Sequence, residues 1–124
     1  MSAVYWFEIP VSDIERAITF YNELLGAEMQ SMDLTETQGT IVAMIPDRGG
    51  AGGMLVQGLE HGYIPSHEGS LVYLDLDGKL EDTLAKVEPA GGSILLPKTS
   101  LGEFGWTAWI EDTEGNRIGL RTAE

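Results

Sequence analysis

The chain has 124 residues, of which 43% are hydrophobic and none is cysteine, and its 7 basic and 20 acidic side chains give a net charge of −13. This length predicts one folded domain over residues 1–124. So negative a chain is a poor partner for nucleic acid or for an anionic membrane surface, and no apolar run approaches the roughly 20 residues that cross a bilayer. The lack of cysteine excludes disulfides and thiolate nucleophiles. Because the start also lacks a signal-peptide pattern, we expect a cytoplasmic protein.

The first half of the chain predicts a strand, a helix and a run of three strands. On the strand predicted over residues 5–11, apolar side chains occupy one face, and Trp6 and Glu8 occupy the other. A stripe of apolar residues at helical spacing begins after Asp13 and ends before Gly26, which are typical N-cap and C-terminal residues of a helix. Three further strands are predicted over residues 31–36, 39–45 and 53–57.

The second half repeats this order after a predicted loop at residues 58–69. The apolar stripe of its helix begins at Leu80, which a shift of 66 residues places on Ile14 of the first helix. A hairpin turn is predicted at residues 112–115. The strands of this half are predicted over residues 71–76, 93–97, 105–111 and 116–122. The sequence therefore predicts two modules of strand-helix-strand-strand-strand, at residues 4–57 and 70–122.

Two segments resemble a known family. Residues 13–26, DIERAITFYNELLG, are similar to the first helix of the vicinal oxygen chelate superfamily, and residues 111–120, EDTEGNRIGL, are similar to its last hairpin. That superfamily includes glyoxalase I, bleomycin-resistance proteins and extradiol dioxygenases. The resemblance implies an α+β fold in which two βαβββ modules in tandem form a curved, half-open mixed sheet with a cleft, and the helices lie on the convex side. It also implies a homodimer.

The resemblance extends to the positions that hold a metal ion in other members. These positions correspond here to Trp6, to Leu71, to one of Gly53, Met54 and Leu55, and to Gly119. None of these side chains is a suitable ligand for a divalent ion of the kind that the family binds. We therefore expect no metal and no other cofactor at this site.

Strand alternation predicts which side chains face the cleft. Trp6 and Glu8 would face it together, as would Leu71 and Tyr73. Centring the last hairpin on residues 112–115 pairs Gly119 with Ala108, Arg117 with Ile110 and Arg121 with Trp106. The last pair would place a cation beside an aromatic ring on the cleft face. This predicts a locally basic cleft with aromatic walls, suited to a small, partly aromatic or apolar molecule.

We predict a small-molecule-binding protein whose reaction, if any, is unassigned. The residues expected to contact the ligand are Trp6, Glu8, Met54, Leu71, Tyr73, Glu103, Trp106, Arg117 and Arg121. The alternative is a lyase or isomerase in which Glu8, with a pKa raised beside Trp6, acts as acid or base together with Glu103 or Tyr73. Glu8 could equally form an ion pair with one of the two arginines and only hold the sheet together.

A last alternative is a metal enzyme whose ligands have moved. His61 and His67 lie in the predicted connecting loop, together with Glu60 and Glu68. Their spacing matches no known ligand motif. Surface histidines are the simpler interpretation, because loop polar residues are mostly exposed.

Overall fold

The computed structural model describes residues 3–47 and 49–124, and in these the order βαβββ occurs twice. In the first module the elements are β1 (Trp6–Val11), α1 (Ile14–Leu25), β2 (Ser31–Leu34), β3 (Thr40–Ile45) and β4 (Gly52–Gln57). In the second they are β5 (Val72–Leu76), α2 (Leu80–Val87), β6 (Ser93–Ser100), β7 (Trp106–Glu111) and β8 (Arg117–Thr122). Two short 3₁₀ helices, η1 (Leu59–His61) and η2 (Gly102–Phe104), lie in loops.

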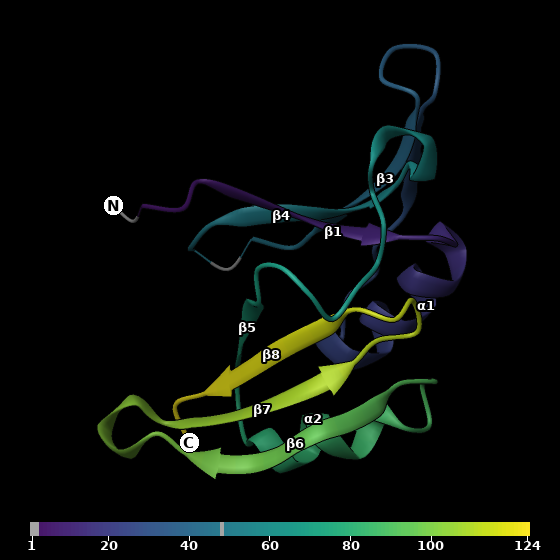
Figure 1. Cartoon of the computed structure of the whole chain (residues 1–124). Coiled ribbons are helices and arrows are strands. Elements are labelled where there is room, and N and C mark those ends of the chain that lie inside the picture. Colours follow the sequence, from purple (N-terminus) through teal and green to yellow (C-terminus); the bar gives the residue numbers. More distant parts are fainter. Residues whose placement is uncertain (1–2, 48) are drawn as a thin grey trace.

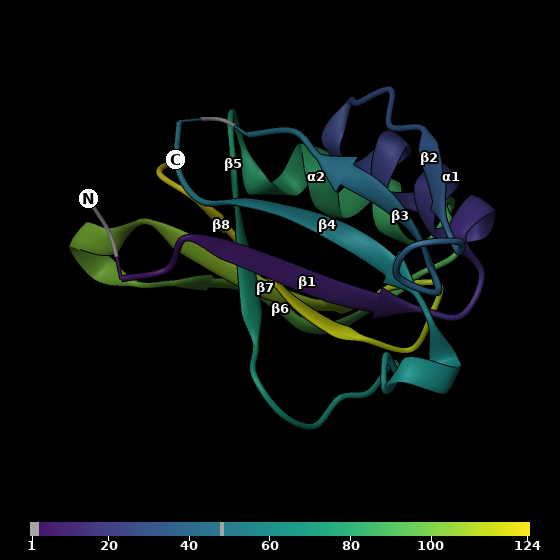
Figure 2. The ribbon, with the colours of Figure 1, turned by 90° about the horizontal axis from the view of Figure 1, so that it is seen from above.

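Each module forms one four-stranded mixed sheet, with strand orders β1-β4-β3-β2 and β5-β8-β7-β6 (Figure 1). In both sheets the first strand pairs in parallel with the last, and the other pairs are antiparallel. Helix α1 packs on the first sheet and α2 on the second, and the two helices touch each other (Figure 2). These observations confirm the predicted α+β fold of tandem βαβββ modules. No helix in the described part of the chain is long and apolar enough to cross a membrane.

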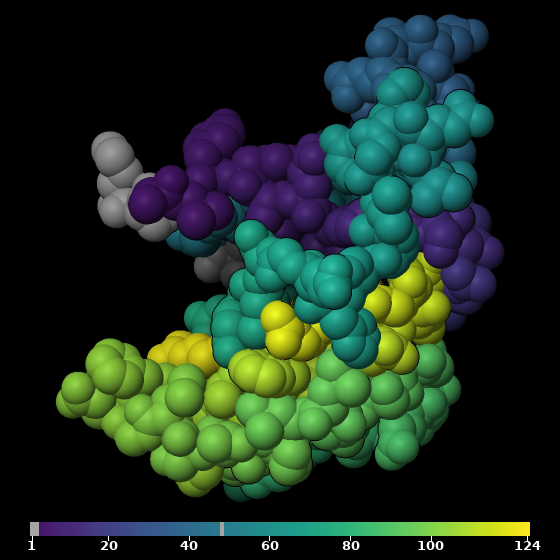
Figure 3. All heavy atoms as spheres, in the orientation of Figure 1, coloured from purple at the N-terminus to yellow at the C-terminus, as the bar shows by residue number. Residues whose placement is uncertain are grey.

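The two sheets diverge from their common core and leave a hollow between them. Figure 3 shows it between β1 (purple) and the second sheet (yellow and green). A cavity of about 600 Å³ lies between the modules, lined by Phe7 of β1 and Ile45 of β3 as well as Val72 and Leu74 of β5. We call this space the inter-sheet cavity.

The two helices differ in how they begin and end. Helix α1 is capped by Asp13, whose carboxylate accepts a hydrogen bond from the Arg16 backbone N–H at 3.1 Å. It ends at Gly26, whose φ of 63° lies in the left-handed region that glycine adopts without strain. Helix α2 is one turn shorter, and its N-cap residue Lys79 makes no side-chain capping bond.

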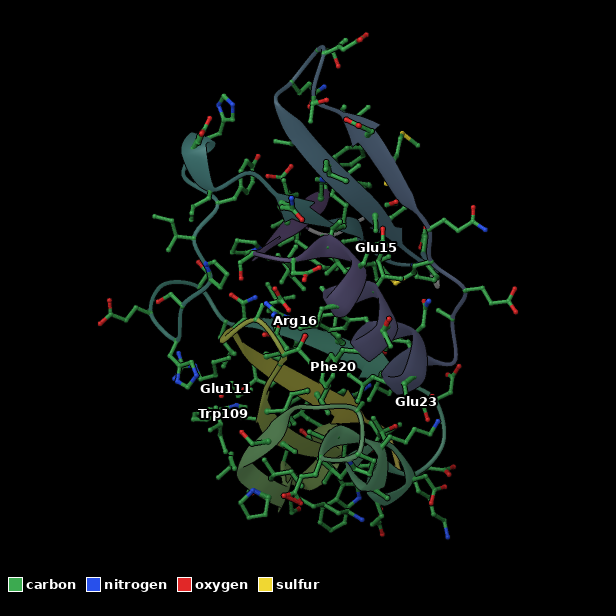
Figure 4. The ribbon with its side chains drawn as sticks, turned by 90° about the vertical axis from the view of Figure 1, so that its right-hand side faces the viewer. Glu15, Arg16, Phe20, Glu23, Trp109 and Glu111 are labelled. Carbon is green, nitrogen blue, oxygen red and sulfur yellow. The ribbon has the colours of Figure 1, made fainter. Side chains whose placement is uncertain are left out.

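The second module also holds the start of α1 through Glu114, a residue of the β7–β8 hairpin. Its side chain is fully buried and accepts hydrogen bonds from the backbone N–H groups of Ser12 and Asp13 and from the Arg16 guanidinium, at 2.7–3.0 Å. Figure 4 shows Arg16 at the start of α1. Burial raises the pKa of the Glu114 carboxyl, but these hydrogen bonds outweigh it and lower the pKa from 4.5 to about 2.

A second buried contact joins the same hairpin to the middle of α1. The Tyr21 hydroxyl donates to Asp112 at 2.6 Å, and burial, with the nearby charge of Asp112, raises the pKa of Tyr21 well above its usual value. Asp112 also accepts from the backbone N–H groups of Glu114 and Asn116, and the Asn116 amide donates to the Pro10 carbonyl at 2.6 Å. The hairpin is thus the polar connection between the two modules.

Some predicted strand boundaries were wrong. Strand β2 ends at Leu34, two residues before the predicted end, and β6 continues to Ser100 although Pro97 interrupts its pattern. Strand β6 lies at the edge of its sheet, where a proline removes no hydrogen bond from a central ladder. Its pairing with β7 is irregular on both sides of Leu96.

Candidate functional site

Each sheet has one face that packs on its helix and one that does not, which we call the open face. On the first sheet Glu8 lies opposite Met54, and Met54 lies opposite Met44, so the three share the open face. Trp6, 41% exposed, lies opposite Gly52 on the same face. A Cβ at Gly52 would come within 2.8 Å of the Trp6 ring, so the indole lies close against the backbone of β4. This face is mainly apolar.

The open face of the second sheet is aromatic and charged. Gly119 of β8 lies between Tyr73 of β5 and Trp109 of β7, and a Cβ at Gly119 would come within 2.5 Å of the Tyr73 ring. The Trp109 Nε1–H donates to the Tyr73 hydroxyl at 2.7 Å. The Arg117 guanidinium lies 5.2 Å from the centre of the Trp109 ring. We call these four residues, Tyr73, Trp109, Arg117 and Gly119, the aromatic shelf.

The predicted pairing of the last hairpin was wrong by one residue. The structure pairs Gly119 with Trp109, Arg121 with Thr107 and Arg117 with Glu111. The loop has three residues rather than two, because Gly115, with φ of 94°, adds a left-handed residue before Asn116 pairs with Asp112. A shift of one residue turns every side chain to the other face. Trp109, absent from the predicted site, therefore lies on the open face opposite Gly119, where Ala108 was expected.

Trp106 and Arg121 are consequently on opposite faces of the second sheet, and the predicted pair between them does not form. Trp106 packs against the core, with the Lys98 ammonium 4.2 Å from its ring centre. Arg121 is on the open face, where it donates to Asp75 and to the Phe104 carbonyl, both at 3.0 Å. The η2 loop thus contacts the open face of the second sheet through Arg121. Glu103, in this loop, is exposed.

Glu8 is exposed rather than enclosed beside Trp6. It accepts a hydrogen bond from the Tyr63 hydroxyl at 2.9 Å instead of pairing with Arg117 or Arg121, and this bond raises the pKa of Tyr63. The segment that carries Tyr63, residues 58–69, runs from the first sheet to the second (Figure 1). It reaches the second sheet where the His67 ring lies 2.5 Å from the Glu111 carboxylate.

The remaining predicted residues lie apart from the shelf. Leu71 lines the inter-sheet cavity, and Met54 is on the first sheet. Figure 4 shows Trp109 and Glu111 on the side of the second sheet away from α1. The structure therefore brings Tyr73 and Arg117 together with Trp109, and places Trp6, Glu8 and Met54 on a different surface.

The residues at the family's metal positions do not fit a metal ion. The Trp6 indole lies over Gly52, the Tyr73 ring covers Gly119, and Leu71 offers no donor. Within residues 3–47 and 49–124, no three side chains of His, Asp or Glu come together in a group that could hold a metal. His61 and His67 are exposed, and His67 contacts Glu111.

Comparison with known families decides the identity of the fold. The model of the glyoxalase/bleomycin resistance protein/dioxygenase superfamily matches residues 3–120, nearly the whole chain. The chain belongs to this superfamily. No curated protein sequence matches it significantly.

Solved structures of the superfamily agree with this. A glyoxalase/bleomycin resistance protein from Albidiferax ferrireducens superimposes with a TM-score of 0.70 at 15% identity over 98% of both chains. An antibiotic-binding protein from Streptomyces sp. CB03234 gives 0.64 at 25% identity, over 100% of this chain and 98% of that one. A glyoxalase I variant from Zea mays gives 0.67 at 20% identity, over 96% of this chain but 45% of its own.

Proposed function

We propose that this member of the superfamily binds a small, planar, partly aromatic acid on the aromatic shelf, without a metal. The observation that carries the proposal is the Tyr73–Trp109 pair. A 2.7 Å hydrogen bond joins the two side chains, and Gly119 between them has no side chain that would separate them. Two rings fixed in this way offer a stacking surface that loses little conformational freedom on binding.

Arg117 supplies the preference for an acid. Its guanidinium is half-buried beside Trp109, and no carboxylate of residues 3–47 and 49–124 forms an ion pair with it. A planar guanidinium binds a carboxylate through two parallel hydrogen bonds. The antibiotic-binding relative supports a binding role within this fold. A lyase or isomerase reaction with Glu8 as acid or base stays a prediction.

The test is calorimetric titration with 2-naphthoate, a planar aromatic acid. Trp109→Leu is expected to weaken binding about tenfold, or about 1.4 kcal/mol, since it removes one stacking surface. Trp6→Leu is the matched control, because it removes an exposed indole from the open face of the other sheet. Equal losses in the two variants, or no binding to the unaltered protein, would refute the proposal.

A second titration separates stacking from charge. Arg117→Gln is expected to weaken 2-naphthoate binding but to leave the neutral analogue 2-naphthamide unaffected. If both compounds lose affinity equally, Arg117 acts through the position of Trp109 rather than on the acid group.

We also propose that the protein is a homodimer. The open face of the first sheet exposes three large apolar side chains, Trp6, Met44 and Met32, by 41%, 46% and 51%. Contiguous exposed apolar surface is typical of an interface between proteins. Met44→Asp is expected to shift sedimentation equilibrium toward the monomer, whereas Glu23→Asp on the exposed side of α1 is expected to change nothing.

A further inference from the structure

The inter-sheet cavity adjoins the open face of the second sheet, because Tyr73 of the aromatic shelf also lines it. Helix-facing side chains of both modules form much of its wall, among them Phe7, Ile45, Val72 and Leu74, and Val4 and Leu71 also line it. Its volume of about 600 Å³ falls within the 300–1,000 Å³ that is typical of small-molecule pockets. Mostly apolar walls at this volume suit an apolar molecule of drug size.

One wall of the cavity is the edge of a strand. Six consecutive residues, 70–75, line it, although neighbouring side chains of a strand point to opposite faces. The cavity is therefore bounded by the backbone of β5, which lies at the end of its sheet and pairs with β8 alone among the described strands. An edge strand turns unpaired N–H and C=O groups outward. A ligand with an uncharged hydrogen-bonding group can satisfy them.

The lining of the cavity favours a neutral ligand over an acid. The charged residues that line it in the described part of the chain are Asp75, which forms an ion pair with Arg121, and Asp77, and among residues 3–47 and 49–124 no lysine or arginine lines it. A carboxylate ligand would lose its hydration among mostly apolar walls, and the described lining offers it no cation in return. The preference is opposite to that of the aromatic shelf, where Arg117 is available to an acid.

We propose that the inter-sheet cavity is a second binding site, adjacent to the aromatic shelf, for a compact neutral apolar molecule with a carbonyl, amide or hydroxyl group. The apolar part would fill the space between Phe7 and Val72, and the polar group would bond to the free edge of β5. The two sites would then differ in the charge of the ligand that each accepts.

The first test compares a neutral and an anionic fluorescent probe. Nile Red, which is neutral and carries a carbonyl, is expected to bind saturably at one molecule per chain with increased, blue-shifted emission. 8-Anilinonaphthalene-1-sulfonate, which is anionic, is expected to bind at least tenfold more weakly. Absence of saturable Nile Red binding, or tighter binding of the sulfonate, would overturn the proposal.

The second test fills the cavity. Ala51, a small half-buried residue of its lining, is replaced by tryptophan, and Ala85, exposed on α2, is replaced in the same way as a control. Ala51→Trp is expected to weaken Nile Red binding at least fivefold, and Ala85→Trp to leave it unchanged. Val4→Asp at the rim, which adds no bulk, is expected to weaken it too. Unchanged binding in folded Ala51→Trp and Val4→Asp proteins would contradict the assignment.

The same variants distinguish this site from its alternatives. Ala51→Trp is expected to leave 2-naphthoate binding intact, so the two proposed sites can fail independently. Nile Red binding is expected to stay at one per chain as the protein is concentrated into a dimer. If the probe is released on association, the cavity is a surface buried between copies and the proposal is wrong.

Discussion

The open faces of the two sheets share their order of strands but differ in chemistry. On the first, Trp6 lies beside the methionines Met44 and Met54, and Glu8 supplies the charge. On the second, Tyr73 and Trp109 lie among ion-pairing side chains such as Arg121. A tandem repeat thus preserves the packing of its helix-facing side while the opposite side diverges. The chemistry of one module is therefore a poor guide to that of the other.

The helix ends show the same asymmetry. The first turn of α1 is held by its own N-cap, Asp13, and by Glu114 of the other module, whereas α2 begins at Lys79 without a side-chain cap. The start of α1 is consequently the point where the stability of one module depends on the other.

Loss of the Glu114 charge is expected to have the largest effect on stability. Glu114→Gln should lower the free energy of unfolding by about 2 kcal/mol, because an amide cannot accept all of the hydrogen bonds that converge on this buried carboxylate. The loss stays below that of a fully buried pair since Arg16 is half exposed. Glu111→Gln, in the same hairpin but 40% exposed, is the control and should cost under about 0.5 kcal/mol in urea unfolding.

The same contact predicts a dependence on acid pH. The pKa of Glu114 is about 2 in the folded protein against 4.5 normally, so its contribution is complete above about pH 4.5 and is lost as the pH falls toward 2. The difference in melting temperature between the unaltered protein and Glu114→Gln should therefore narrow between pH 4.5 and 2.5. A constant difference over this range would show that the charge of Glu114 does not stabilise the junction.

Substituting the glycine beneath each ring tests the contrast between the two faces directly. Gly119→Ala should cost about 1–2 kcal/mol, because its Cβ displaces a Tyr73 ring that is tied to Trp109. Gly52→Ala should cost about 0.5 kcal/mol or less, since the exposed Trp6 ring can rotate into solvent. Both free energies are measured by urea unfolding. Equal costs of the two substitutions would mean that the Tyr73 ring is held no more firmly than the Trp6 ring.

Exchanging the helix caps should give the smallest effects, of opposite sign. Asp13→Ala should destabilise the protein by about 1 kcal/mol, because the N–H of Arg16 loses its acceptor. Lys79→Asp should stabilise it by about 0.5 kcal/mol, since a carboxylate can cap α2 and interacts favourably with the positive end of the α2 helix dipole. Destabilisation by Lys79→Asp would mean that Lys79 has a role at the start of α2 other than capping.

Much of the fold could be predicted from the sequence. The apolar stripes that begin at Ile14 and Leu80 mark the two helices, and their equal place in each half indicates the repeat. The site could be predicted less well, because it depends on the register of one hairpin. Gly115 followed by Asn116 was the available signal for a three-residue loop. Treating it as a two-residue turn placed Trp106 rather than Trp109 on the open face in the prediction.

Other features of the site come from long-range packing that no local pattern encodes. Tyr63 reaches Glu8 from 55 residues away in the sequence. Similarly, Glu114 caps a helix about 100 residues before it. The inter-sheet cavity exists because the two sheets diverge. The alternation of side chains within each strand carries no information on the angle between the sheets.

The most direct test of the difference between the two sheets is to follow the indole N–H signals of the three tryptophans by nuclear magnetic resonance during titration with 2-naphthoate. The Trp109 signal, whose N–H bonds to Tyr73 beneath the proposed ligand, is expected to shift saturably, while the signals of Trp6 and Trp106 stay in place. Saturable movement of the Trp6 signal with Trp109 unchanged would place binding on the first sheet and contradict the account.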